Sequence, residues 1–106
     1  MTDILKTLER TILERREAEP DQSYVASLRA KGRAKMAEKL GEEAIEAVIA
    51  SVQDDKAAMT GEAADLLFHL MVLLADMDMS LDDVIAELAR REGLSGLQEK
   101  ASRGTS

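Results

Sequence analysis

Two groups of acidic residues stand at helical spacing near the middle of the 106-residue chain. The first group contains Glu42, Glu43 and Glu46, and the second contains Glu62 and Asp65. Residues three or four positions apart lie one turn apart on the same side of a helix, so each group would present its carboxylates together. Fifteen residues separate the two groups, which is enough for one helix to end and the next to return antiparallel. We therefore expect the carboxylates to face each other across an interhelical groove.

Carboxylates that converge in a partly dry groove repel one another unless a cation neutralises them. The chain has no cysteine and one histidine, so the available ligands are mainly carboxylate oxygens. Such ligands favour the hard cations Mg²⁺ or Mn²⁺ over Zn²⁺. The clustered acids thus predict a divalent metal site that could hold a polyphosphate substrate. The alternative is that each acidic pair belongs to an ordinary solvated helix face.

His69 is the only polar residue between Leu66 and Ala75, and it follows Asp65 by four residues. We expect a buried imidazole that hydrogen-bonds Asp65 and orients its carboxylate without a catalytic role. A helix that is apolar nearly all round must be covered on more than one side. A chain this short has few elements for that purpose, so we expect a homodimer assembled around the helix over 56–77.

Five basic residues precede the first acidic group within eleven positions: Arg29, Lys31, Arg33, Lys35 and Lys39. The three lysines recur every four residues and lead along one helix face towards Glu43. Ammonium groups placed beside a metal site suit a ligand with several phosphates, so we predict phosphate contacts for these lysines. Ion pairs within the helix are the alternative for Lys35 and Lys39, and they leave the other three basic residues without a nearby acid.

The composition predicts helices that position these groups. The chain has one proline, 45% hydrophobic residues and 33% charged residues, which favours an all-α fold, an antiparallel bundle of four to five helices. We expect buried positions in the third helix at Met36, Leu40, Ala44 and Val48, and close approach of a ligand or another helix at Gly41. The expected helices cover residues 3–19, a short segment between the Ser23 cap and Gly32, 33–52, 56–77 and 81–92. We expect residues 1–92 to form a single domain and residues 93–106 to form a mobile tail.

Several function classes are disfavoured by the same figures. The net charge of -7 and the 2% aromatic content argue against nucleic-acid binding, which relies on clustered basic residues and stacking rings. The most apolar stretch, 66–75, is shorter than the roughly 20 residues of a membrane span, and no secretory signal is visible. We therefore expect a cytoplasmic protein that acts on a small molecule.

The motif residues together resemble the phosphoribosyl-ATP pyrophosphatase family, a branch of the MazG-like all-α nucleoside triphosphate pyrophosphatases. The resemblance covers about residues 4–103, with Phe68 where the family often has Tyr. It rests on Lys39-x-Gly41-Glu42-Glu43-x-x-Glu46, Glu62-x-x-Asp65-Leu66-Leu67-x-His69-Leu70, Ser23-Tyr24, Lys31-Gly32 and Gly93-Leu94-Ser95-Gly96-Leu97.

The resemblance implies Mg²⁺-dependent hydrolysis of phosphoribosyl-ATP to phosphoribosyl-AMP and pyrophosphate, the second step of histidine biosynthesis. The residues supply a mechanism that is compatible with this activity, in which Glu43, Glu46, Glu62 and Asp65 hold the metal. Lys39, with Lys31 and Lys35 beside it, would contact phosphates, and Glu42, Glu43 or Glu46 would activate the water, among which the sequence does not choose. Two alternatives remain: a house-cleaning pyrophosphatase that acts on other nucleoside triphosphates, and a helical dimerisation module without catalytic activity.

Overall fold

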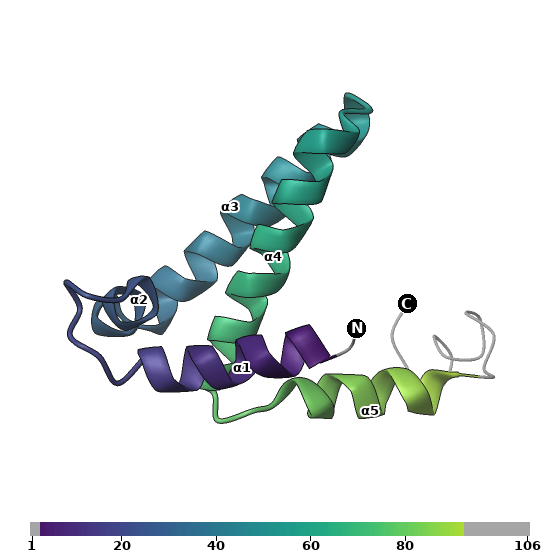
Figure 1. Ribbon diagram of the computed structural model, residues 1–106. Coiled ribbons are helices and arrows are strands. Elements are labelled where there is room, and N and C mark those ends of the chain that lie inside the picture. Colours follow the sequence, from purple (N-terminus) through teal and green to yellow (C-terminus); the bar gives the residue numbers. More distant parts are fainter. Residues whose placement is uncertain (1–2, 93–106) are drawn as a thin grey trace.

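The computed structural model describes residues 3–92, which form five α-helices (Figure 1). No strand occurs within these residues, so the all-α prediction is confirmed. The expected tail over 93–106 lies outside the described residues. The helices are α1 (Asp3–Arg15), α2 (Tyr24–Lys31), α3 (Arg33–Val52), α4 (Lys56–Asp76) and α5 (Leu81–Arg91).

The first helix ends at Arg15 instead of Glu19. The N–H groups of Glu17 and Ala18 donate to carbonyl oxygens three residues back, at 3.2 and 3.1 Å, so the chain tightens into a turn. Pro20 follows, and a proline disfavours helical backbone angles for the residue before it. The later helices end within one residue of their predicted positions, which is the ordinary uncertainty of a helix terminus.

The junction between α2 and α3 is a single glycine. Ser23 caps the N-terminus of α2, and its hydroxyl accepts a hydrogen bond from the N–H of Ala26 at 3.1 Å. Gly32 ends α2 with φ 101° and ψ 168°, a backbone conformation that is essentially restricted to glycine. The glycine therefore allows α3 to start immediately in a new direction.

Replacement of Gly32 by Ala is expected to lower the free energy of unfolding by about 1–3 kcal/mol, because a Cβ atom strains this conformation. Gly61 is a matched control: it lies inside α4, and a Cβ there would meet nothing within 4 Å. Gly61→Ala should raise stability by up to about 1 kcal/mol through helix propensity. Urea unfolding at one fixed protein concentration measures both changes. Equal stability of the Gly32→Ala variant and the wild type would contradict the conclusion that this backbone conformation requires glycine.

The two longest helices, α3 and α4, lie antiparallel and form an arm that rises from the other helices (Figure 1). The turn between them contains Asp54 in a left-handed conformation, with φ 55°. Asp55 caps the N-terminus of α4, and its carboxylate accepts a hydrogen bond from the N–H of Ala58 at 3.1 Å. This arrangement brings the middle of α3 opposite the first half of α4.

The hydrophobic core lies at the base of the arm, where α1, α2 and the start of α3 meet the second half of α4. Two arginines hold the end of α4 there. Arg16 donates to the carbonyl oxygen of Ala75 at 3.0 Å, and Arg33 contacts both the carboxylate and the carbonyl oxygen of Asp76 at 2.8 and 3.0 Å. The core residues are Ile12, Val25, Leu28, Met36, Met71, Val72, Ala75 and Leu81.

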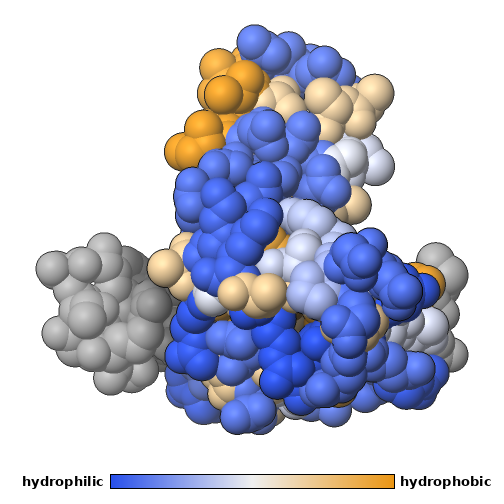
Figure 2. All heavy atoms as spheres, turned by 90° about the vertical axis from the view of Figure 1, so that its left-hand side faces the viewer, coloured by the Kyte–Doolittle hydropathy of each residue, from blue (hydrophilic) through white to orange (hydrophobic). Residues whose placement is uncertain are grey.

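The side of α3 that faces away from α4 is uncovered above this base. Met36 is buried as expected, and Leu40 and Ala44 are half-buried, but the prediction for Val48 is wrong because 57% of this residue is exposed. No third element of the described chain reaches that height along the arm. Figure 2 shows hydrophobic residues gathered on one side of the arm above a hydrophilic base.

By length and composition alone, α4 could cross a membrane, and it is the only such helix among residues 3–92. The core helix of a soluble protein passes the same test. The second half of α4 does supply core residues, including Met71 and Val72. Packing in the core therefore explains the apolar residues of this second half.

Candidate metal centre

Three carboxylates from the two helices of the arm converge. Glu43 comes from α3, and Glu62 and Asp65 come from consecutive turns of α4. One oxygen atom from each of these residues lies within 4.8 Å of the other two. In an octahedral Mg²⁺ site neighbouring oxygen ligands stand about 3 Å apart and opposite ones about 4 Å apart, so the three side chains would have to move closer together to share one ion.

The cluster contains buried oxygen atoms without partners. Within the described part of the chain, Oε2 of Glu43 and Oε2 of Glu62 are buried and make no hydrogen bond. Burial raises the pKa of Glu43 to about 7, and the neighbouring Glu46, Asp65 and Glu62 add to this effect. The pKa of Glu62 is raised as well, first by burial and then by the charge of Glu46. These oxygens therefore need a proton or a cation.

Glu46 lies at the edge of this trio. Its side chain is exposed. It lines one surface hollow with Glu42 and a second with Glu62. Its charge nevertheless raises the pKa of both Glu43 and Glu62, so it stands near both carboxylates. The fold thus places the four acids predicted as metal ligands in one neighbourhood, with three of them closest together.

The metal-free protein is expected to lose stability as the pH rises from 4.5 to about 7. In that interval the unfolded chain has ionised Glu43, while the folded protein keeps this residue protonated because its pKa is raised to about 7. The folded state then binds more protons, so an increase in pH favours unfolding. In the presence of a chelator, the melting temperature of Glu43→Gln should depend less steeply on pH than that of the wild type. Parallel profiles would contradict the pKa assignment.

The three lysines predicted to contact phosphates differ in their partners. Lys39 donates to Glu42 at 3.1 Å and Lys35 pairs with Glu38 at 3.2 Å, so the intrahelical pairs considered from the sequence are present. Lys31 is exposed on the last turn of α2. These three lysines remain candidates for phosphate contacts, and only Lys39 is directly linked to a residue beside the carboxylate cluster.

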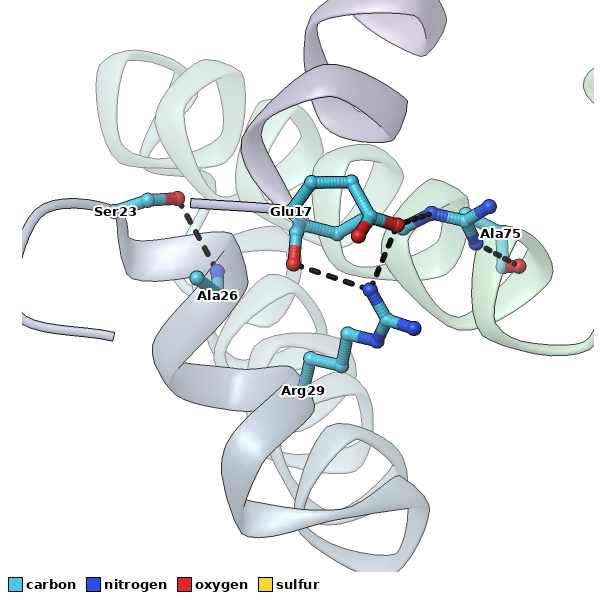
Figure 3. A network of polar contacts seen from close by, with 6 residues as sticks. Glu17, Ser23, Ala26, Arg29 and Ala75 are labelled. Carbon is cyan, nitrogen blue, oxygen red and sulfur yellow. Dashed lines mark hydrogen bonds and ion pairs between the residues drawn. The ribbon is translucent and has the colours of Figure 1, made fainter. Parts of the chain in front are cut away.

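Two arginines that lacked acidic neighbours in the sequence have distant partners in the fold. Arg29 contacts the carboxylate of Glu17 at 2.9 Å and the carbonyl oxygen of Arg16 at 3.2 Å (Figure 3). Arg33 pairs with Asp76. Neither pairing could be inferred from helical spacing, and both arginines stabilise the base of the arm.

The imidazole of His69 is buried and bonded on both nitrogens. Nδ1 lies 2.8 Å from the backbone carbonyl oxygen of Asp65, and Nε2 lies 2.9 Å from the hydroxyl of Tyr24. The expected partner one turn away is therefore present, but through its backbone and not through its carboxylate. The contact between Tyr24 and His69 spans 45 positions, so helical spacing could not predict it, and only the family resemblance pointed to Tyr24.

Gly41 has no close neighbour on the outer side of α3. A Cβ at this position would meet nothing within 4 Å, so the fold of one chain does not provide the close helix contact that the sequence suggested. Instead, Gly41 lies with Glu42, Ile45 and Glu46 along a shallow, open hollow on the surface of α3. This hollow adjoins the exposed edge of the carboxylate cluster.

These features define a class of protein: an all-α fold in which two antiparallel helices hold a carboxylate cluster suited to a hard cation. The model of the phosphoribosyl-ATP pyrophosphohydrolase family matches residues 5–92. The chain therefore belongs to that family.

Relatives match over nearly the full length of the chain. A protein named phosphoribosyl-ATP pyrophosphatase from Rhizorhabdus wittichii is 62% identical over 103 residues, which cover 97% of both chains. The protein of the same name from Erythrobacter litoralis is 62% identical over 94% of this chain and 96% of its own. The one from Novosphingobium aromaticivorans is 59% identical over 95% of this chain and 94% of its own.

Proposed function

We propose that this protein hydrolyses phosphoribosyl-ATP to phosphoribosyl-AMP and pyrophosphate, the second step of histidine biosynthesis. Water attacks the triphosphate, the anhydride bond between the α and β phosphates breaks, and pyrophosphate leaves. The family match supports the substrate, and the convergence of Glu43, Glu62 and Asp65 supports the chemistry. We also propose that the protein is soluble and works in the cytoplasm.

The proposed cofactor is Mg²⁺, with Mn²⁺ as a substitute. The unpartnered buried oxygens of Glu43 and Glu62 fit a hard cation, and Asp65 completes the closest set of oxygen donors. When bound, such an ion neutralises the carboxylates and stabilises negative charge that develops on the leaving pyrophosphate.

The protein's own side chains divide the remaining tasks. Glu42 is engaged by Lys39, and the closest trio of acids has buried oxygens. Glu46 is exposed at the edge of the trio and faces both hollows, so we assign it the orientation and deprotonation of the attacking water. Lys39 holds a phosphate of the substrate when its ammonium group turns from Glu42, and Lys31 and Lys35 add positive charge nearby.

The alternative substrate class is a plain nucleoside triphosphate cleaved by the same carboxylates. A pyrophosphate-release assay distinguishes the two by comparing phosphoribosyl-ATP with dUTP, dCTP and ATP at equal concentrations, with and without Mg²⁺. We expect phosphoribosyl-ATP to have the highest kcat/KM and to require the metal. Preference for dUTP or dCTP would overturn the substrate assignment, and release from none of them would favour a module without catalytic activity.

We further infer that two copies of the chain associate through the arm. The sequence predicted a dimer around α4, but we place the dimer contact on α3. No exposed large hydrophobic residue of the described chain lies in α4, whereas α3 has four. The exposed stripe on α3 follows helical spacing and would be covered by the same stripe of a second copy. It consists of Ile45, Val48, Ile49 and Val52, which are 60%, 57%, 49% and 80% exposed.

A further inference from the structure

Tyr24 is an exposed aromatic residue that is nevertheless held in a fixed orientation. It is the first residue of α2 and half of it is exposed. Its ring stacks on Phe68 with a centroid distance of 6.2 Å and an interplanar angle of 23°. Its hydroxyl lies 2.9 Å from Nε2 of His69. A surface tyrosine needs none of these restraints for solubility.

The hydrogen positions in this network follow from the identity of the acceptors. A backbone carbonyl oxygen can only accept, so Nδ1 of His69 carries the hydrogen that it shares with Asp65. In the neutral ring, Nε2 is then the acceptor, and Tyr24 donates its only hydroxyl hydrogen to it. The phenolic oxygen is left with lone pairs alone, so any further partner must be a donor.

One side chain links the same oxygen to the candidate metal centre. His69 contacts the Tyr24 hydroxyl through Nε2 and the backbone carbonyl oxygen of Asp65 through Nδ1. The pKa of Lys39 is raised by its hydrogen bond to Glu42 and by the charge of Glu42, with further contributions from Tyr24 and Glu43. The ammonium group of Lys39 therefore lies within electrostatic range of both the Tyr24 phenol and the carboxylates of Glu42 and Glu43. A nucleotide whose phosphates occupy the cluster would extend past Lys39 towards Tyr24.

We propose that Tyr24 is a specificity-determining residue that accepts a hydrogen bond from a ribose hydroxyl of the nucleotide. This inference rests on the proposed nucleotide substrate, but it concerns the sugar and not the bond that is cleaved. A ribose hydroxyl is a donor, whereas the corresponding 2′-deoxy or 3′-deoxy position is not. The orientation imposed by His69 thus favours ribonucleotides over the deoxynucleotides that a house-cleaning enzyme would accept, and His69 is a positioning residue.

The test compares Tyr24→Phe with the wild type. Loss of one neutral hydrogen bond corresponds to roughly a 2- to 12-fold change, which should appear as a higher KM for phosphoribosyl-ATP with kcat nearly preserved. In competition assays the wild type should bind ATP more tightly than 2′-deoxy-ATP or 3′-deoxy-ATP, and the variant should lose the preference. Ser27→Ala removes a hydroxyl that donates to the backbone carbonyl oxygen of Tyr24 itself. It leaves the phenol in place, so KM and preference should be unchanged.

The ribose preference of His69 variants tests whether His69 positions the Tyr24 hydroxyl. His69→Leu should lose the same preference as Tyr24→Phe, and His69→Gln, which retains an acceptor, should recover part of it. Equal affinity of the wild type for ATP and both deoxy analogues, or a preference that survives in Tyr24→Phe, would overturn the inference. Failure of the proposed function is a separate result: the wild type would then not release pyrophosphate from phosphoribosyl-ATP, while the ribose preference could still be measured by binding alone.

Discussion

Replacement of Asp65 by Asn is expected to lower pyrophosphate release from phosphoribosyl-ATP by at least about 100-fold, the scale of losing one electrostatic element of an active site. Asn has nearly the same shape as Asp but lacks the negative charge that holds a hard cation. Asp65 also contributes to the raised pKa of Glu43 and Glu62. Its neutralisation therefore relieves repulsion in the metal-free protein, so stability should be retained while turnover is lost.

Glu38→Gln is the matched control for this experiment. Glu38 is an exposed acid of α3 that pairs with Lys35, and it lies outside the carboxylate cluster. The control should keep nearly full activity, because an exposed ion pair contributes about 1 kcal/mol or less. Steady-state kinetics at saturating Mg²⁺, together with circular dichroism of both variants, gives the comparison. Near-normal turnover of Asp65→Asn would remove this residue from the catalytic cluster.

Replacement of Val48 by Glu is the second change with a large expected effect, and it acts on association. If two copies cover the stripe on α3, the variant buries a carboxylate from each copy in an apolar interface. An unpaired buried charge costs several kcal/mol, so the dissociation constant of the dimer should rise roughly 1,000-fold or more. Light scattering coupled to size-exclusion chromatography should show a dimeric wild type and a monomeric variant that keeps its helical content.

Ile4→Glu provides the control for this substitution. Ile4 is 68% exposed on α1 and lies outside the stripe on α3. The same charge introduced there should leave the mass of the assembly unchanged. A wild type that is monomeric at all accessible concentrations, or a Val48→Glu protein that stays dimeric, would contradict association through this stripe.

Much of the site could be predicted because helical periodicity decides which residues share a face. The spacing of Glu43, Glu62 and Asp65, with a turn of suitable length between them, was sufficient to predict their convergence, which the coordinates show. The same periodicity could not reveal whether a face is covered. Val48 belongs to the apolar pattern of α3, yet no element of the described chain packs against it.

Partners that are distant in the sequence were also beyond this kind of prediction. Arg33 pairs with Asp76, 43 positions away, because α3 starts beside the end of α4. The contact of Tyr24 with His69 depends in the same way on the direction of α2, which Gly32 and the tertiary fold determine. Spacing within one helix contains no information about such pairs, so the sequence left these residues without assigned partners.

The most direct test of the account is calorimetric titration of the protein with Mg²⁺, and with Mn²⁺ in parallel, for the wild type and Glu62→Ala. Glu62 belongs to the trio of converging carboxylates and carries a buried, unpartnered oxygen. We expect saturable binding to the wild type and an affinity that is at least about tenfold weaker after removal of this ligand. Equal binding to both proteins, or no binding to the wild type, would contradict a metal centre between α3 and α4.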